Sequence, residues 1–519
     1  MILKDLQPLS IVEDEGFRRL LKILAPLYTV PSRMTITSRI DEKFVALSSI
    51  VKEKLTGIDN IVLTSDIWTD KYNSKSYLCL TAHFIEGTKI ESINLGVRLL
   101  EEAHNAIYLS QILKSFCHEW NIDLNKVIIM ITDNAANISK AARDTFGHLP
   151  CFAHQLNLVV RDAIKLTPEF KNIVTKVKEI VTFLKRSVEA ADELRALQMK
   201  TNPNGKHLKV IQESETRWNS TFYMLKRFCK LSEFISTVLF KYSDLQMLSY
   251  SDITCIEESL KILFPIESVT VEMSGKKYVT GSKIIPIVHC LNSVISRLNP
   301  CNEIAEKLKN NILDQIDTRF YGREYSNQSS IEKNYFLSVA TLLDPRFKKL
   351  HFTSIMDCSK AITRVSNLLK QRNNIENQAN NVNCLKTPPK SNVLSVWNFH
   401  DELAYNNTKN GSPNLHFYPK NCVNNLSSDI STELRQFLNT PVSLRETDCL
   451  EEWEKLKYVY PNVYEIARKF LLVLGTSVSS ERLYSTAGNI ISEKRSRLSS
   501  NRVSMLIFLN SLKTKYWEM

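Results

Sequence analysis

The 519-residue sequence lacks several features that define membrane, secreted or fibrous proteins. No run approaches the roughly 18 consecutive apolar residues that a membrane-spanning helix needs. The N-terminus carries acidic residues early and has no apolar core segment, so we expect no signal peptide and no membrane partner. Glycine and proline are scarce, at 12 and 16 residues, which argues against collagen-like, low-complexity and turn-dense all-β architectures.

Paired cysteines are also missing. The 11 cysteines are scattered, their number is odd, and no two stand in a Cys-x-x-Cys arrangement. This pattern indicates reduced thiols in the cytosol or nucleus rather than a disulfide framework. It also excludes an intact zinc finger of the Cys-x-x-Cys type, so we expect no zinc site in this chain.

What the chain does have is a moderate excess of positive charge. Lysine and arginine number 67 against 55 aspartate and glutamate, which gives a formal charge of +12. Spread over this length, the excess is compatible with a polyanionic partner, but a mildly basic enzyme would show it equally. Hydrophobic residues make up 43%, so most of the chain should fold, and its length predicts about three globular units.

Hydrophobic patterning predicts an α/β part followed by a helical part. Residues 104–120 have the apolar spacing of a helix, and four segments read as strands, namely 61–64, 76–84, 91–99 and 126–132. Three strands, a helix and then a buried strand indicate a mixed sheet with helical cover. From Pro168, apolar residues repeat at helical spacing through Leu194, which predicts one long helix that ends by Asn202.

We expect this organisation to continue to the C-terminus in distinct regions. Helical patterns extend to about residue 370, and two Asn-rich stretches then indicate flexible linkers. Between these stretches, Val396-Trp397 is an apolar island that should dock on a folded neighbour. The predicted regions are a helical lead-in (1–60), the first part of the α/β core (61–165), an all-helical region (166–370), a flexible Asn-rich linker region (371–445) and a helical C-terminal region (446–519).

Two aspartates stand where a predicted buried strand meets a loop. Asp66 and Asp133 would project at the same edge if their strands are neighbours in the sheet. Two carboxylates held together repel unless a divalent cation lies between them, and this arrangement is typical of Mg²⁺-assisted phosphoryl transfer. The alternative is that each aspartate caps the turn that follows it, which is the commoner role of a single strand-end aspartate.

Six short motifs make the sequence more informative as a set than any one of them alone. They are residues 65–69 (SDIWT), 132–137 (TDNAAN), 151–158 (CFAHQLNL), 216–221 (TRWNST), 342–346 (LLDPR) and 476–488 (TSVSSERLYSTAG). Together and in this order they resemble the hAT superfamily of DNA transposases, most closely its host-gene-like branch, the zinc finger BED domain-containing proteins. The resemblance runs from about residue 5 to residue 512.

The resemblance implies a fold and a catalytic site. The fold is an α/β ribonuclease H-like core that is interrupted by a large all-α insertion and completed by a helical C-terminal dimerisation region. The site is an Asp-Asp-Glu triad, carried onto Asp66, Asp133 and Glu481, which would bind Mg²⁺ (or Mn²⁺) for DNA strand cleavage and transfer. From the residues alone, Glu481 near a helix N-terminus is explained by the helix dipole, worth about 0.3–1 kcal/mol.

The resemblance also implies DNA contacts and an accessory pair. Trp218 would stack on a flipped base beside the DNA-binding Arg217, and Cys151 and His154 match a pair thought to assist strand cleavage. The alternatives are a core tryptophan, an arginine paired with Glu213, a buried thiol and a core histidine.

Near the C-terminus the sequence offers a basic patch and an apolar helix face. Lys494, Arg495 and Arg497 would contact the DNA backbone or serve nuclear import, although such a short patch is usually a solvated surface. The apolar residues of 503–512 need a partner, which in this family is a second subunit or the catalytic core.

Departures from the family pattern leave the function open between two hypotheses. The family carries a BED zinc finger before this region and none is expected here, while Leu474 and Ser479 replace prolines, and Glu213 and Glu452 replace other usual residues. We expect a nuclear, DNA-binding homodimer or higher homo-oligomer that is either a metal-dependent transposase or a catalytically inactive, domesticated regulator that binds DNA or chromatin. A protein–protein scaffold is a third, weaker hypothesis.

Overall fold

The computed structural model describes residues 1–70, 74–202, 205–214, 218–242, 245–275, 281–322, 330–373, 396–409, 430–478, 480, 488, 490 and 498–518. Within them, five strands form one mixed sheet in the order β3-β2-β1-β4-β5. The strands are β1 (Ile61–Thr69), β2 (Ser76–Glu86), β3 (Lys89–Leu100), β4 (Val127–Thr132) and β5 (His148–Pro150).

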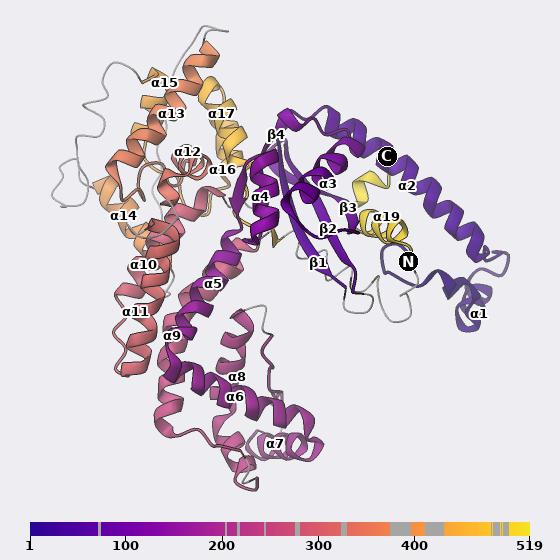
Figure 1. The fold of residues 1–519 in the computed structure, drawn as a ribbon, viewed down its shortest axis with the longest axis vertical. Helices are drawn as coiled ribbons and strands as arrows, with labels where there is room; N and C mark the ends of the chain where they lie inside the picture. The colour runs from indigo at the N-terminus through magenta and orange to yellow at the C-terminus, as the bar shows by residue number, and fades with distance from the viewer. Residues whose placement is uncertain are drawn as a thin grey trace.

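Helices accompany this sheet in three groups (Figure 1). Around the sheet lie α2 (Arg33–Thr56), α3 (Ala106–Glu119), α4 (Ala136–Thr145) and α19 (Ser500–Ser511), with α1 (Glu15–Leu24) before α2. A second group comprises α5 (Phe152–Lys165), α6 (Pro168–Arg186), α7 (Val188–Thr201), α8 (Trp218–Leu239), α9 (Tyr250–Met273), α10 (Ile284–Ser296) and α11 (Glu303–Ile316). The third comprises α12 (Tyr335–Leu343), α13 (Ile355–Asn373), α14 (Asn398–Lys409), α15 (Thr432–Asn439), α16 (Cys449–Leu456) and α17 (Pro461–Leu471). Among the described helices, none combines the length and the apolar composition that a bilayer crossing requires.

The two faces of the sheet bury different side chains, because successive residues of a strand point to opposite faces. In β1, Ile61 and Leu63 belong to the core formed with α2, α3 and α19, whereas Val62 belongs to the core formed with α5. In β4, Met130 joins the first core and Ile129 the second. Burial on both faces explains why these strands appear in the sequence as continuous apolar runs.

The predicted strands and the helix over 104–120 are confirmed as β1 to β4 and α3. The expected end of the first strand before Asp66 is wrong, because β1 continues to Thr69 and pairs Asp66 with Cys79 of β2. The short β5 is not predictable from the pattern, because three residues that end in Pro150 show no periodicity. Strands β1, β2 and β3 pair antiparallel, and β1, β4 and β5 pair parallel. This mixed sheet with mostly helical surroundings fits a ribonuclease H-like core accompanied by a helical region.

The prediction of one long helix from residue 168 to residue 202 is wrong. The chain forms α6 and α7 instead, and they meet at Ser187, whose backbone is extended (φ −85°, ψ 112°). The Ser187 hydroxyl accepts a hydrogen bond from the Ala190 amide at 3.2 Å and caps α7. Val188, assigned by the pattern to the apolar face, is consequently 76% exposed. A local capping preference here overrides the apolar periodicity.

Residues of and around the 342–346 motif hold the third helical group together. Arg346 donates two hydrogen bonds to the buried carboxylate of Asp344, at 2.9 and 2.6 Å. Lys348 donates to the carbonyl of Phe437 at 2.8 Å, and Trp453 donates to the last carbonyl of α12 at 2.8 Å. These bonds tie α12 to α15 and α16, so this motif has a structural role.

The apolar face of the C-terminal helix finds a partner within the chain. Leu506 and Leu509 of α19 are buried against the sheet, where the helix crosses β3. The Ser504 hydroxyl accepts a hydrogen bond from the Val97 amide at 3.0 Å. Gly96 (φ 112°) permits this approach, since a Cβ there would lie 2.4 Å from the Ser504 hydroxyl. Two partners were possible for this apolar face, a second subunit or the core of the same chain, and the structure shows the core.

The apolar island docks as predicted. Trp397 is 3% exposed, stacks on Phe347 with ring centroids 5.8 Å apart, and donates from Nε1 to Glu272 at 2.7 Å. Helix α14 follows directly. Elsewhere in the predicted linker region of 371–445, the expectation of a flexible linker is wrong for residues 432–439, which form α15 with Leu434 and Phe437 buried. Residues 374–395 and 410–429 lie outside the described residues.

A chain of three histidines secures α14. His400 Nδ1 lies 2.8 Å from His351 Nε2, and His351 Nδ1 lies 3.2 Å from His289 Nδ1 on α10. Burial lowers the pKa of His400 to about 4, and burial with the neighbouring imidazoles holds the pKa of His351 well below its usual value. Both rings are therefore neutral near pH 7.

Acidification should destabilise the docking of α14. An unfolded histidine titrates near pH 6.5, so below that pH the unfolded chain binds more protons than the folded one and stability falls. We expect a loss of about 1.4 kcal/mol per buried histidine between roughly pH 7.5 and pH 5.5, measured by urea unfolding with tryptophan fluorescence. His400→Gln should reduce this slope, and His118→Gln, at an exposed position of α3, should not. A flat profile over this range would contradict the assignment.

Candidate functional site

Asp66 and Asp133 lie at the same edge of the sheet. β1 and β4 pair in parallel, and their last pair is Thr64 with Ile131. Asp66 lies two residues further along β1, and Asp133 directly follows the end of β4. Both side chains are half-buried. Adjacent parallel strands thus place the two aspartates, 67 residues apart in the sequence, in the same region of the sheet.

Main-chain amides orient both carboxylates. Asp66 Oδ1 accepts from the Ile67 amide at 2.9 Å, and Asp133 Oδ1 accepts from the Ala135 amide at 3.2 Å. The Asp133 carbonyl accepts from the hydroxyls of Thr132 and of Ser139 on α4, at 2.9 and 3.2 Å. Asp133 therefore does cap the turn that follows it, and this hydrogen bond holds its side chain in a defined orientation.

A C-terminal segment passes beside these strands. We call residues 473–478 and 480 the crossing segment. On its helical side, the Gly281 amide donates to the Val473 carbonyl at 3.1 Å, and the Thr476 hydroxyl donates to the Met273 carbonyl at 3.2 Å. Residue 281 must be glycine here, because a Cβ would lie 2.2 Å from the Val473 carbonyl oxygen.

On its other side the crossing segment contacts the sheet and the start of α5. The Phe152 amide donates to the Gly475 carbonyl at 2.8 Å, and the Ser477 amide donates to Cys151 Sγ at 3.3 Å. The hydroxyls of Ser480 and Thr64 lie 3.0 Å apart. Thr64 precedes Asp66 by two residues, so the crossing segment reaches the strand that carries the first aspartate.

Buried polar groups extend this contact across the sheet. Thr64 Oγ1 lies 2.9 Å from His83 Nε2 on β2, and His83 Nδ1 lies 2.8 Å from Ser92 Oγ on β3. Burial lowers the pKa of His83 to about 3, so its imidazole is neutral. A continuous row of hydrogen bonds therefore links β3, β2, β1 and Ser480.

The remaining predicted site residues fall into two groups, those outside the described part of the chain and those within it. Glu481, Arg217, Lys494, Arg495 and Arg497 lie outside the described residues. Within the described part of the chain, no group of three or more His, Cys, Asp or Glu side chains is arranged to hold a metal ion. Ser480 immediately precedes the predicted third ligand in the sequence.

The accessory pair lies at the beginning of α5. Cys151 is 1% exposed and accepts the hydrogen bond from the crossing segment, while His154 is half-buried on the first turn of the helix. Glu213, the expected alternative partner of Arg217, forms an ion pair with Lys178 at 3.7 Å.

Trp218 occupies the core in this structure. Its side chain is 4% exposed, packs edge-on against Phe222 with centroids 6.3 Å apart, and begins α8. Its amide donates to Asn157 Oδ1 on α5 at 3.0 Å. The expectation that this ring stacks on a flipped base does not describe this conformation, because the surrounding helices cover the ring.

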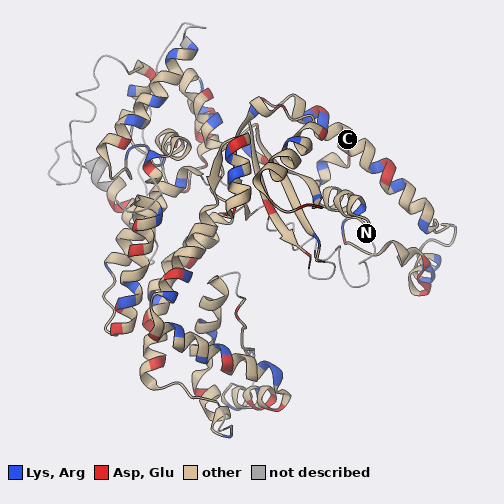
Figure 2. Cartoon of the chain, viewed as in Figure 1, with Lys and Arg blue, Asp and Glu red and all other residues tan. Residues whose placement is uncertain are grey.

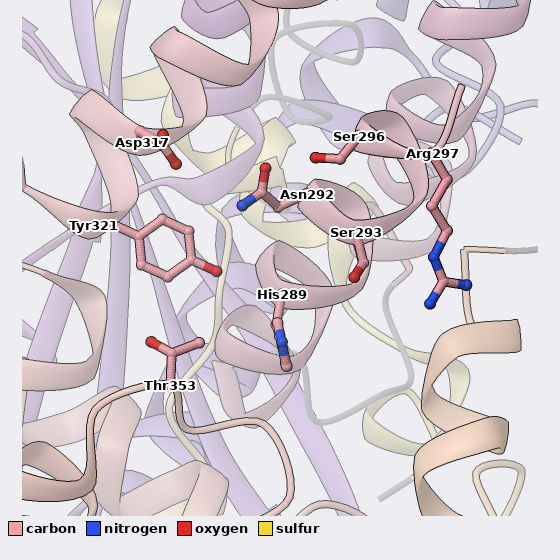
Figure 3. Close-up of a pocket in the computed structure, with 8 residues that line it drawn as sticks. All are labelled: His289, Asn292, Ser293, Ser296, Arg297, Asp317, Tyr321 and Thr353. Carbon is pink, nitrogen blue, oxygen red and sulfur yellow. The ribbon is translucent and has the colours of Figure 1, made fainter. Parts of the chain in front are cut away.

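A separate pocket of about 520 Å³ lies in the helical part (Figure 3). It is bordered by α10, by the π-helical turn η4 (Asp317–Tyr321) and by Thr353. His289 of the histidine chain and Arg297 line it. It shares no lining residue with the acid pair.

Sequence reasoning misses the residues that join the parts of the site. Thr64 and His83 belong to no motif, and Ser480 lies within the 476–488 motif but has no role predicted for it. A polar residue inside an otherwise apolar strand, such as His83 within β2, is the one signal that could have indicated a buried hydrogen-bonded row.

Removing the Thr64 hydroxyl should weaken the contact with the crossing segment. Thr64→Val would leave buried polar groups of His83 and Ser480 without this partner, at a cost of about 1–3 kcal/mol in the free energy of unfolding. Urea unfolding measures this loss. Thr69→Val, at an exposed position of the same strand, is the control and should change stability by less than about 0.5 kcal/mol. Equal stability of the two variants would contradict the described contact.

Comparisons with known proteins agree with this arrangement. Residues 64–151 match the ZBED1 RNase-like domain, residues 149–260 match the ZBED1 RNase-like helical domain, and residues 433–512 match the hAT family C-terminal dimerisation region. The boundary between the first two matches lies at Cys151, where the sheet ends and α5 begins.

Individual relatives include both transposases and zinc finger BED proteins. Zinc finger BED domain-containing protein 4 of Homo sapiens is 26% identical over 98% of this chain, and the AC9 transposase of Zea mays is 26% identical over 96%. The Hobo transposase of Drosophila melanogaster is 26% identical over 43% of the chain. The chain spans 42%, 63% and 35% of the length of these relatives. The matched domains, their order and these relatives show that the chain is similar to hAT transposases and to the transposase-derived zinc finger BED proteins.

Proposed function

We propose that this protein binds DNA in the nucleus and catalyses metal-dependent strand cleavage and transfer with Asp66, Asp133 and Glu481. The observation that carries this proposal is that Asp66 and Asp133 both lie just beyond the last parallel pair of β1 and β4, Thr64 with Ile131, beside the crossing segment. The named transposases among the relatives support the reaction class.

The donor set of the proposed site fits a hard divalent cation. Asp66 and Asp133 present carboxylate oxygens, which are the ligands that Mg²⁺ and Mn²⁺ prefer, and Glu481 would add a third carboxylate. A cation between the two aspartates also removes their mutual repulsion. When bound, the metal supplies polarisation of the DNA phosphate and activation of the attacking oxygen.

The protein's own residues supply orientation and DNA affinity. The amides of Ile67 and Ala135 hold the carboxylates toward the edge of the sheet. The net charge of +12 favours a polyanionic partner, and Lys494, Arg495 and Arg497 would contribute to backbone contacts. We further propose that residues 433–512 pair two copies of the chain, in line with the description of the family region that they match.

A second candidate function is a catalytically inactive, dimeric DNA- or chromatin-binding regulator. Two observations favour it. Trp218 is covered rather than presented to DNA, and one relative, 26% identical over 55% of this chain, is named a transcriptional regulator, tpeD of Talaromyces stipitatus.

Isosteric removal of the acids distinguishes the two functions. Asp66→Asn, Asp133→Asn and Glu481→Gln should each lower Mg²⁺- or Mn²⁺-dependent nicking of supercoiled plasmid DNA at least about 100-fold, because each removes a metal ligand while keeping side-chain volume. Asp144→Asn, at an exposed position of α4, should nick at the wild-type rate. A wild-type protein that binds DNA but never nicks it would favour the regulator.

The oligomeric state tests the proposed pairing. Light scattering at micromolar concentration should give twice the 59.7 kDa of one chain. Tyr458 is 78% exposed within the matched dimerisation region, so Tyr458→Asp should shift the equilibrium toward the monomer. Tyr250→Asp, 88% exposed but outside that region, should leave the dimer intact. A monomeric wild-type protein would contradict this part of the proposal.

A further inference from the structure

The burial of Trp218 raises the question of which aromatic rings the same helices present to solvent. α8 and α9 pack against each other, and each carries an exposed aromatic residue on the shared outer face. Tyr223 on α8 is 38% exposed and Phe264 on α9 is 42% exposed. Exposed aromatic rings lose favourable burial, so their presence on one face indicates an interaction surface.

A lysine of α8 contacts the exposed ring of α9 and so connects the two helices. Lys226 Nζ lies 5.5 Å from the centroid of Phe222 and 6.0 Å from that of Phe264. The Tyr223 hydroxyl donates to Glu267 on α9, which holds the tyrosine ring in place and raises its pKa to about 12. The Tyr223 ring is therefore held at its hydroxyl end, and both rings remain partly exposed to solvent.

The same face carries unpaired positive charge. Lys226 and Lys230 share a face of α8, and Lys261 stands one turn before Phe264 on α9; all three are exposed. No carboxylate of the described residues lies within ion-pair distance of these three lysines. Of the acids nearby, Glu267 is engaged by Tyr223, and Glu257 stands one turn before Lys261. We call Tyr223, Lys226, Lys230, Lys261 and Phe264 the α8–α9 platform.

Charges of both signs are interspersed along the helices, so their overall charge does not indicate a partner (Figure 2). The partner is therefore inferred from the side chains of the platform itself. Exposed rings offer faces on which unpaired bases can stack, and free ammonium groups beside them offer contacts to phosphates. A double helix keeps its bases stacked inside, so it could use the lysines but not the rings. A second protein chain would more commonly find uncharged surface at the centre of the patch.

We propose that the α8–α9 platform binds single-stranded nucleic acid, with bases on Tyr223 and Phe264 and phosphates on the lysines. This inference deepens the proposed function, because cleaved DNA has unpaired ends, and it rests on that function for the identity of the nucleic acid. The helix that carries three of the platform residues is joined to α5, which begins beside the sheet. α8 begins at Trp218, which is bonded to Asn157, and Asn157 lies six residues beyond Cys151, or about 9 Å along α5.

Binding of a labelled single strand tests this inference. The probe is a fluorescein-labelled oligothymidylate of about 16 nucleotides, and fluorescence anisotropy is measured with the full chain in EDTA, so that cleavage plays no part. The double variant Tyr223→Ala, Phe264→Ala should bind at least about tenfold more weakly, because stacking on each ring is lost. Lys226→Gln with Lys230→Gln should reduce the salt dependence of binding.

Matched variants separate stacking from folding. Tyr223→Phe keeps the ring and loses the hydroxyl, so it should bind the probe as the wild type does. Tyr250→Ala removes an exposed ring at the start of α9, away from the platform, and should also bind normally. Thermal unfolding checks that the double variant remains folded, and an unlabelled duplex of the same length should compete only weakly.

Three outcomes would overturn the inference. They are a wild-type protein that does not bind the single strand, a double variant that binds it as tightly as the wild type, and a double variant whose defect is a change of oligomeric state in light scattering. None of them touches the catalytic proposal, since nicking by the acid variants is measured independently. Conversely, tight stacking-dependent binding by a protein that never nicks DNA would support the platform and the regulator together.

Discussion

The candidate site depends on one set of contacts, those that hold the crossing segment against β1 and the start of α5 at the same time. The Ser480–Thr64 hydrogen bond joins residues 416 positions apart, and the Ser477–Cys151 bond joins residues 326 positions apart. The residues between Cys151 and Ser477 form the second and third helical groups. The helical part must therefore fold and return the chain to the sheet before residues beyond 480 can approach the two aspartates.

This dependence gives several family motifs a structural meaning. The 342–346 motif and Trp453 fasten the C-terminal region to α12, and Cys151 receives the crossing segment. The row from Ser92 through His83 to Thr64 completes the contact on the sheet side. A transposase and an inactive regulator would both need this framework. They differ in whether the acids at the edge still bind metal, so an intact fold is no argument for activity by itself.

The sequence predicts the elements better than their connections. The continuous apolar runs of β1 and β4 are visible because both faces of those strands are buried, and the two strands are parallel neighbours, the condition on which the prediction for Asp66 and Asp133 depends. The break at Ser187 and the short β5 escape prediction, since a single cap and a three-residue strand leave no periodic signal. Burial of Trp218 escapes prediction for another reason. A motif records residue type, whereas the exposure of a side chain is decided by the tertiary packing of the helical part.

If Asp66, Asp133 and Glu481 hold one metal ion, as proposed, iron-directed cleavage of the polypeptide should cut the chain at all three segments. Fe²⁺ replaces Mg²⁺ at the site, and peroxide with ascorbate then generates radicals that cut the backbone near the metal. The account predicts cuts near residues 66, 133 and 481, all suppressed by excess Mg²⁺ and by Asp133→Asn. Cuts at only one of these segments, or none above background in a folded protein, would contradict it.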